Sequence, residues 1–395
     1  MKKRFLFTTC LLVASVCGCS NNTISKEANS EIDANHSTLS NDSVSSEQYN
    51  LQNNTVDALY FDSSENIYEH GIIYGNGDNP KMYMDFNSME STVLCARPNC
   101  THTTSECIAK QIGKTPIIYN DYIYFFDVKD GVKEESDGRT FYIDSKLKRV
   151  SLATSEIDVI SEFTDCEPRE YDGGVIFDGT LYFCGDDMNP TADDYGGISY
   201  ANGGGTHYLC SIDLDSGEYT NYGSIYDEDK NYESANHTST AHITGYYNSK
   251  IYIQYSFMKE YNENTEIDTR DKFTFLNFEF DPKTKTLILS ELPTASFMNN
   301  NTYVCSNYPD NSTTVFWGDK KYIVNGADAK FIGKFFNGKL FIYDHWYDVT
   351  SGTLHSLGDD KKFVTMYNDC YIISNQAGTK YEKLTENELL SLDKG

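Results

Sequence analysis

A short phrase that recurs five times most constrains the fold of this 395-residue chain. Each copy has aromatic or aliphatic residues, then an Asn or Asp with a second turn residue, then a strand-like run. The copies are IIYNDYIYFF (117–126), VIFDGTLYFC (175–184), GYYNSKIYIQ (245–254), KFFNGKLFIY (334–343) and TMYNDCYIIS (365–374). Pairs such as Asn-Gly, Asp-Gly and Asn-Asp supply the positive φ angles of tight two-residue turns, so each phrase predicts a β-hairpin.

A second phrase follows the first at a variable distance and also predicts hairpins. Its bends contain Asp-Ser-Gly, Asp-Pro-Lys-Thr or Thr-Ser-Gly, which are turn-forming combinations. The copies are YLCSIDLDSGEYTNY (208–222), FLNFEFDPKTKTLIL (275–289) and IYDHWYDVTSGTLHSL (342–357), with a looser version, FYIDSKLKRVSLATSEIDVI, at 141–160. Two hairpins per unit make about four strands, which is the content of a propeller blade.

The spacing of the first phrase predicts the number of blades. The interval from Asn248 to Asn337 is the longest, so we expect it to contain a degenerate unit around VFWGDKKYIV (315–324). Another unit is expected before the first phrase, at 72–94. The sequence therefore predicts an all-β fold, a β-propeller of six or seven blades, within residues 57–395. A large β-sandwich or a β-solenoid competes, but a sandwich does not explain paired hairpin phrases with a shared turn signature.

One helix is expected, close to the C-terminal end. Thr385 and Glu388 have the spacing of a capping box, and Leu389 and Leu390 follow. The sequence predicts a short helix there.

The hairpin phrases resemble those of bacterial surface proteins whose domain is similar to the β-propeller of low-density-lipoprotein-receptor-related proteins. The resemblance covers roughly residues 57–375. It implies a binding or scaffolding role and supplies no catalytic residues.

The N-terminal residues predict export and lipid attachment. Basic residues at 2–4 precede an apolar stretch, 5–16, that is shorter than the ~20 residues needed to cross a bilayer. The sequence VCGC at 16–19 resembles the bacterial lipobox, whose Cys accepts a diacylglyceryl group. We therefore expect residues 1–19 to form a lipoprotein signal, cleaved before Cys19. The alternative is an ordinary signal peptide with a chance Cys.

The expected mature protein is extracytoplasmic and anchored to the bacterial cell membrane by lipid on Cys19, because several acyl chains on one residue give stable attachment. Residues 20–56 are rich in Ser, Asn, Thr and Glu, which predicts a disordered tether.

The strongly acidic composition restricts the partners. The formal net charge is −27, so we expect no nucleic acid partner. Acidic insertions interrupt three units at 127–140, 185–207 and 257–272, and the middle one contains Tyr195 and Tyr200. Loops inserted at one topological point of every blade emerge on the same face. That face is the candidate surface for binding an unknown protein, peptide or glycan, and solvated loops without a partner are the alternative.

Three cysteines and a histidine fall in one segment, LCARPNCTHTTSEC. Cys95, Cys100, His102 and Cys107 offer four soft ligands, which is enough to enclose a structural zinc ion. Two alternatives stay open for this segment of a chain with eleven Cys. One is a disulfide within the segment, with the third Cys bonded to Cys166 or another cysteine. The other is free thiols.

No arrangement of residues in the sequence indicates catalysis. Neither Gly-x-Ser-x-Gly nor His-Glu-x-x-His occurs. The sequence therefore nominates no catalytic residue and favours a binding module. The alternative is a surface glycosidase or polysaccharide lyase with carboxylates in the propeller channel, since 59 acidic residues offer many candidates.

Overall fold

The computed structural model describes most of the chain after residue 58. The described residues are 59–60, 66–68, 70–75, 79–95, 97, 99–112, 116–135, 138–169, 174–186, 190–192, 198–200, 206–226, 239–258, 273–293, 295–299, 301–307, 312–325, 334–342 and 344–392. The predicted signal and tether, 1–56, lie outside them. None of the helices found in the described ranges is long and apolar enough to cross a membrane.

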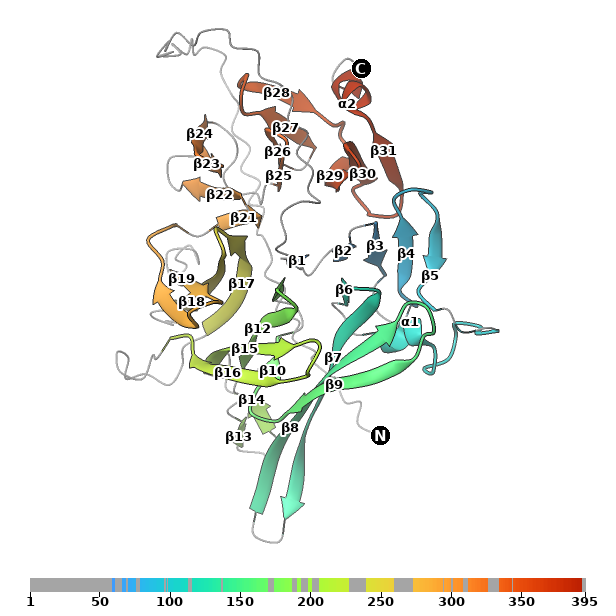
Figure 1. Cartoon of the computed structure of the whole chain (residues 1–395), viewed down its shortest axis with the longest axis vertical. Coiled ribbons are helices and arrows are strands. Elements are labelled where there is room, and N and C mark those ends of the chain that lie inside the picture. Colours follow the sequence, from blue (N-terminus) through green and yellow to red (C-terminus); the bar gives the residue numbers. More distant parts are fainter. Residues whose placement is uncertain are drawn as a thin grey trace, which may run out of the picture. The chain divides into compact units, whose positions relative to one another are not determined.

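The predicted propeller is confirmed, and it has seven blades (Figure 1). Each blade is an antiparallel sheet whose strands follow chain order. Blade 1 contains β2 (Asn66–Tyr68), β3 (Gly71–Tyr74), β4 (Met82–Asp85) and β5 (Ser91–Val93). Blade 2 contains β6 (Ile117–Tyr119), β7 (Tyr122–Glu135), β8 (Gly138–Ser151) and β9 (Ile157–Phe163).

Blade 3 is the largest sheet because two short strands join it. Its main strands are β11 (Gly174–Phe177), β12 (Thr180–Asp186), β15 (His207–Asp213) and β16 (Tyr219–Ser224). The added strands are β1 (Leu59–Tyr60), paired with β11, and β10 (Glu167–Pro168), paired with β12. Blade 4 contains β17 (Ser239–Tyr247), β18 (Lys250–Met258), β19 (Phe273–Asp281) and β20 (Thr286–Leu289).

The last three blades complete the series. Blade 5 contains β21 (Ala295–Asn299), β22 (Thr302–Asn307), β23 (Ser312–Trp317) and β24 (Lys320–Asn325). Blade 6 contains β25 (Lys334–Phe336), β26 (Lys339–Ile342), β27 (His345–Asp348) and β28 (Thr353–Ser356). Blade 7 contains β29 (Lys361–Tyr367), β30 (Cys370–Asn375) and β31 (Tyr381–Leu384). The expected units at 72–94 and around 315–324 are therefore confirmed as blades 1 and 5.

Apolar clusters between consecutive blades hold the ring together. Each of the seven described clusters joins two neighbouring blades, as where Tyr303 of blade 5 packs among residues that include Tyr252 of blade 4. The cluster of Ile72, Met84 and Phe86 with Val364 and Ile372 joins blade 1 to blade 7. The ring is thus closed by side-chain packing between its first and last blades.

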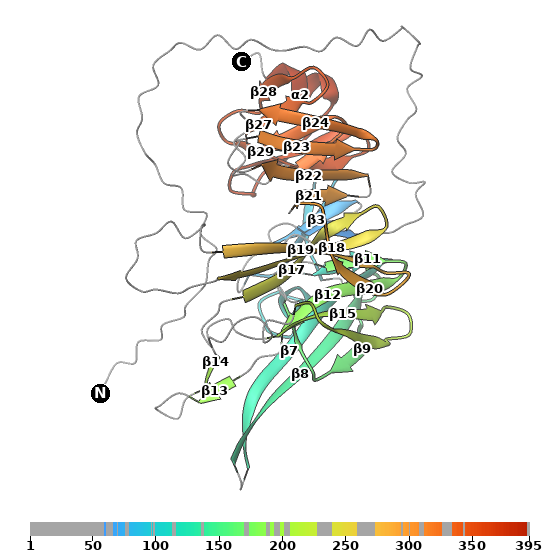
Figure 2. The ribbon, with the colours of Figure 1, turned by 90° about the vertical axis from the view of Figure 1, so that its left-hand side faces the viewer.

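Two kinds of connection divide the propeller into two faces. One face, here called the turn face, carries the tight turns that join strands 1–2 and strands 3–4 of a blade. The predicted turns are confirmed, since Asn120, Asp121, Asn368 and Asp369 all have positive φ. The other face, here called the loop face, carries the connections from strand 2 to strand 3 and from one blade to the next. The β-strand ends of blade 4 that lead into these connections project to the left in Figure 2.

One predicted insertion is not a loop. Residues 127–140 extend the strands β7 and β8 into a long hairpin that leaves the ring (Figure 1). Cross-strand register explains the difference, because Asp127 lies opposite Lys146 and Lys129 lies opposite Asp144. Opposite charges at paired positions stabilise a ladder that also satisfies the backbone hydrogen bonds.

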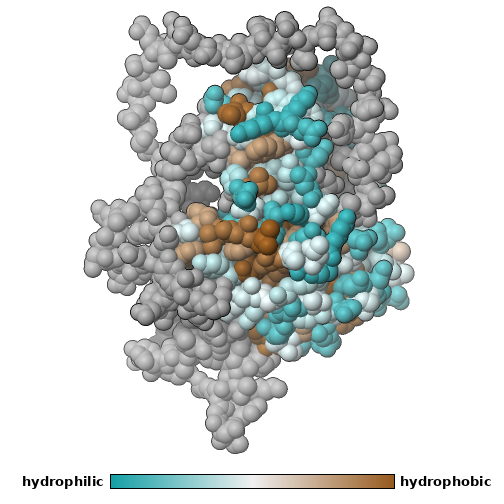
Figure 3. Space-filling model, turned by 60° about the vertical axis from the view of Figure 1, so that its left-hand side comes forward, coloured by the Kyte–Doolittle hydropathy of each residue, from teal (hydrophilic) through white to brown (hydrophobic). Residues whose placement is uncertain are grey.

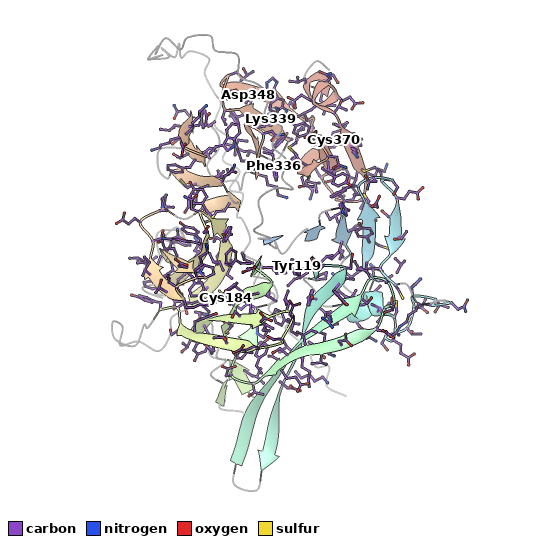
Figure 4. The ribbon with its side chains drawn as sticks, in the orientation of Figure 1. Tyr119, Cys184, Phe336, Lys339, Asp348 and Cys370 are labelled. Atoms are coloured by element: carbon purple, nitrogen blue, oxygen red, sulfur yellow. The ribbon has the colours of Figure 1, made fainter. Side chains whose placement is uncertain are left out.

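The predicted C-terminal helix is confirmed as α2 (Glu386–Leu392). Its capping box is present: Glu388 Oε2 accepts from Thr385 N at 2.8 Å, and Thr385 Oγ1 accepts from Glu388 N at 3.4 Å. The helix is fastened to blade 6 by Lys339, whose Nζ lies 2.8 Å from Glu386 Oε1. Figure 4 shows Lys339 beside Asp348, its cross-strand partner.

Candidate metal centre and loop face

The Cys and His segment lies in the connection from blade 1 to blade 2, on the loop face. The segment is tied to blade 1 by two backbone hydrogen bonds, from Leu94 N to Lys81 O and from Lys81 N to Ala109 O. The short helix α1 (Ile108–Gln111) follows Cys107 and packs in the core between the two blades. The segment is therefore anchored at both of its ends.

The structure brings the four predicted ligands together. One ligand atom from each of Cys95, Cys100, His102 and Cys107 lies within 4.8 Å of all the others. The Cys107 Sγ is 3.5 Å from His102 Nδ1. A tetrahedral zinc ion with bonds of about 2.3 Å to sulfur separates its thiolates by roughly 3.8 Å, so this donor set fits zinc after small side-chain movements. The thiols are free in the structure.

Local backbone conformation turns the four side chains inward. Asn99 and His102 both have φ near 60°, in the left-handed region. The bend is supported by the Arg97 guanidinium, which donates from Nη1 to Glu106 O at 2.9 Å. Cys107 is fully buried while the other three ligands are partly exposed. A metal ion here would be bound on its core side by Cys107 and on its solvent side by the other three ligands.

The surroundings act differently on the thiols. Burial, and then hydrogen bonding with Cys100, raises the pKa of Cys107 to about 11. Burial also acts to raise the pKa of Cys95. Hydrogen bonds from the backbone N–H groups of Arg97 and Ile108, and from the neighbouring thiols, outweigh it, so this pKa is lowered. The backbone at Cys95 thus favours the thiolate that metal binding requires.

A polar cluster that sequence reasoning missed lies between blades 3 and 4. His207 Nδ1 is 2.5 Å from Asp186 Oδ1, and His207 Nε2 is 3.0 Å from Ser239 Oγ. This is the order of a serine hydrolase triad, but Ser239 is 2% exposed and His207 is 3% exposed. Arg169 Nε also holds Asp186 Oδ2, at 2.6 Å. A buried hydroxyl offers no access to a substrate, so we interpret the cluster as polar contacts that hold blades 3 and 4 together.

Three other predicted site residues remain. Cys19 and Tyr195 lie outside the described residues. Tyr200 belongs to the short strand β14 (Ile198–Tyr200), which pairs with β13 (Pro190–Ala192) inside the middle insertion. The insertion at 257–272 is described only at 257–258, the end of β18.

The other described cysteines lie in or beside blades 3, 5 and 7, and Figure 4 labels Cys184 of blade 3 and Cys370 of blade 7. Cys184 and Cys210 are buried in blade 3, as expected of small apolar side chains. Cys370 is only half-buried, because it follows directly after a turn of blade 7. Cys166 lies against Cys210 in the core between blades 2 and 3.

The third and fourth strands of several blades carry exposed apolar side chains. Blade 4 carries the most, with Phe275 at 54%, Ile288 at 55% and Leu289 at 59% exposure. Figure 3 shows hydrophobic surface in this region among hydrophilic residues. Scattered exposed apolar residues are normal on soluble domains, so the outer rim does not define a site by itself.

Comparison with known proteins finds no family for this chain and only distant structural similarity. No family model and no curated protein sequence matches the chain. An oligogalacturonate lyase in complex with manganese is similar in structure at 14% identity, covering 83% of this chain and 79% of its own, with a TM-score of 0.27. An auxiliary nutrient binding protein from Bacteroides thetaiotaomicron is similar at 9% identity, covering 83% and 76%, with a TM-score of 0.28. The class defined by the structure is a seven-bladed β-propeller with a Cys3His cluster in its first interblade connection.

Proposed function

We propose that this chain is a lipid-anchored extracytoplasmic protein that uses the loop face of its propeller to bind a protein, peptide or glycan. The asymmetry of the two faces is the observation that carries the proposal. The turn face is closed by short turns linked by backbone hydrogen bonds, such as Leu214 N to Gly179 O at 2.9 Å. The long connections all leave from the loop face. Loops on a rigid scaffold are frequent binding sites.

The innermost strands favour binding over the alternative of a glycosidase or polysaccharide lyase. A channel enzyme of that kind needs a pair of carboxylates converging on the channel. Neither the first strand of each blade, as described, nor β1, which pairs with the inner edge of blade 3, contains Asp or Glu; the first strands are β2, β6, β11, β17, β21, β25 and β29. The binding reading is therefore better supported.

A screen of the mature chain tests the binding proposal. The chain would be immobilised through its N-terminal end and presented to a glycan array and to solubilised bacterial surface proteins. We expect a partner that is retained by the wild-type chain and lost when Tyr195 and Tyr200 are both replaced by Ala. Retention by a variant in which Leu354, an exposed residue of blade 6, is replaced by Ala is the matched control.

Anchoring is tested separately, by labelling. A producing bacterium fed a clickable palmitate analogue should label the chain, and Cys19→Ser should abolish the label. An unlabelled wild-type chain would contradict the proposed lipid anchor and would leave the proposed binding by the loop face unaffected.

We also propose that Cys95, Cys100, His102 and Cys107 hold a structural zinc ion that fixes the blade 1 to blade 2 connection. Three thiolates and one imidazole form a closed zinc shell with no open position for catalysis. Elemental analysis of the purified chain should find about one zinc per chain, and Cys107→Ala should lose it. Cys184→Ala, which removes an equally buried thiol elsewhere, should keep it. A metal-free wild-type chain would contradict this proposal.

A further inference from the structure

Two cysteine side chains outside the metal cluster meet in the core between blades 2 and 3. Cys166 lies between β9 and β10, and Cys210 lies in β15. Their Sγ atoms are 3.6 Å apart, and both residues are 0% exposed. The hydroxyl of Tyr219 lies 3.3 Å from Cys166 Sγ and 3.4 Å from Cys210 Sγ. We infer that Cys166 and Cys210 form a disulfide bond that ties the blade 2 to blade 3 connection to the centre of blade 3.

The space around Cys166 allows the bond to form by side-chain movement. A disulfide has an S–S distance of about 2.05 Å, so the two sulfur atoms must approach by roughly 1.5 Å in total. Residue 185 is glycine, and a Cβ there would lie 2.6 Å from Cys166 Sγ. The bare glycine thus provides the space that the Cys166 side chain uses.

The backbone on each side of the pair is already fixed. Ser145 Oγ donates to Cys166 O at 3.1 Å, and Pro168 of β10 pairs with Gly185 of β12. Cys210 is held in register opposite Phe183. No rearrangement of the sheet is needed to join the two sulfur atoms.

The chemistry is a thiol–disulfide exchange with a low-molecular-weight disulfide such as oxidised glutathione. One protein thiolate attacks the oxidant's S–S bond and forms a mixed disulfide, releasing one glutathione thiolate. The second protein thiolate then displaces the other glutathione and closes the bond. Two protein thiols lose two hydrogens in total, and one oxidant disulfide becomes two thiols.

Burial determines when this exchange takes place. Hydrogen bonding with Cys166 and burial raise the pKa of the Cys210 thiol, so few thiolates form in the folded core. The bond should therefore form during folding, before blades 2 and 3 pack. Once formed, it is shielded from reductants. Exported proteins fold under conditions where such bonds persist, but the in vitro test below does not depend on export.

The bond would lie near the base of the middle insertion on the loop face. Glu167, next to Cys166, pairs with Asp186, the last residue of β12, which lies at the start of the middle insertion predicted at 185–207. A disulfide at Cys166 would hold the start of that insertion in place whichever partner the loop face binds.

Peptide mapping tests the inference directly. The full chain is folded in a glutathione redox buffer, alkylated in denaturant without reductant and cleaved before aspartate. This cleavage places Cys166, Cys184 and Cys210 in separate peptides, 165–171, 178–185 and 194–212. We expect peptides 165–171 and 194–212 to be linked and two hydrogens lighter than their sum. Cys184 is expected alkylated, as the internal control. Alkylated Cys166 and Cys210, or Cys166 linked to another cysteine, would overturn the inference.

Thermal unfolding supplies a second, independent readout. The wild-type chain is unfolded, reduced with a phosphine and refolded. Its Tm should then be about 5 °C lower than that of the oxidised wild-type chain. The Cys184→Ala variant should show the same shift. A double variant with Cys166→Ala and Cys210→Ala should show none. If the wild-type chain and the double variant respond equally to the reductant, the inference is overturned.

Discussion

At the scale of single residues, one turn design is repeated around the turn face. An Asp carboxylate accepts hydrogen bonds from backbone N–H groups two and three residues further along the chain. In blade 3, Asp213 Oδ1 accepts from Asp215 N at 3.2 Å and from Ser216 N at 2.7 Å. Asp85, Asp281 and Asp348 make the same pair of contacts in other blades. Each of these carboxylates therefore stabilises the turn in which it lies.

Removing one of these carboxylates should weaken the fold in a pH-dependent way. Hydrogen bonds from the Ser216 backbone and side chain hold the pKa of Asp213 below its usual 3.8. A lowered folded-state pKa stabilises the protein above the unfolded value, and the gain is lost as pH falls through the folded value. We expect Asp213→Ala to cost about 1 kcal/mol at pH 7.

Denaturant unfolding at several pH values checks this prediction. The difference between wild type and Asp213→Ala should be constant from pH 7 to 5 and shrink below about pH 4. Asp215→Ala, in the same turn, is the control and should change little. An equal loss at every pH would contradict the role given to the charge.

At the scale of elements, the sequence predicts the hairpins well and the connections poorly. Asn-Gly and Asn-Asp pairs predict tight turns, because few other residues adopt positive φ, so the turns and the repeated units could be predicted from the sequence. The continuation of β7 and β8 through 127–140 depends on which residues face each other across the hairpin, and spacing alone does not give that register. The Cys cluster was readable because its ligands are close in sequence. The Cys166–Cys210 pair and the Asp186–His207–Ser239 cluster could not be predicted, because their residues come from segments that are distant in sequence.

The polar cluster of Asp186, His207 and Ser239 between blades 3 and 4 should be important for stability. His207→Ala removes the buried imidazole that contacts both Asp186 Oδ1 and the Ser239 hydroxyl, at a cost of about 2 kcal/mol. His345→Ala removes a histidine that is 46% exposed in its side chain and should cost under about 0.5 kcal/mol. Chemical unfolding of both variants measures the difference, and equal midpoints would show that the cluster does not hold the blades.

The terminal helix should contribute through one buried leucine. Leu389 is 0% exposed in the cluster that joins blades 6 and 7, whereas its neighbour Leu390 is 37% exposed. Replacing Leu389 by Ala should cost about 3 kcal/mol through lost burial and a residual cavity. The same change at Leu390 should cost much less. Similar unfolding midpoints for the two variants would mean that the helix is not docked on the ring.

At the scale of the whole molecule, the propeller is a scaffold with one simple and one elaborate face. Packing between blades 7 and 1 closes the ring without a shared strand among the described residues. The Cys and His cluster, the long hairpin and the middle insertion all belong to connections on the loop face. The hairpin and the middle insertion both lie between the second and third strands of their blades, which is why their common face was predictable from the sequence. The blade 1 to blade 2 connection reaches the same face because it follows the last strand of blade 1.

Comparison of the two faces with one partner tests the central claim most directly. Equilibrium binding of a partner retained by the wild-type chain would be measured for the Tyr195→Ala, Tyr200→Ala double variant of the loop face and for Asp215→Ala on the turn face. We predict that the loop-face variant weakens binding at least tenfold and that the turn-face variant leaves it unchanged. Weakened binding in the turn-face variant, with an unaffected loop-face variant, would contradict the assignment.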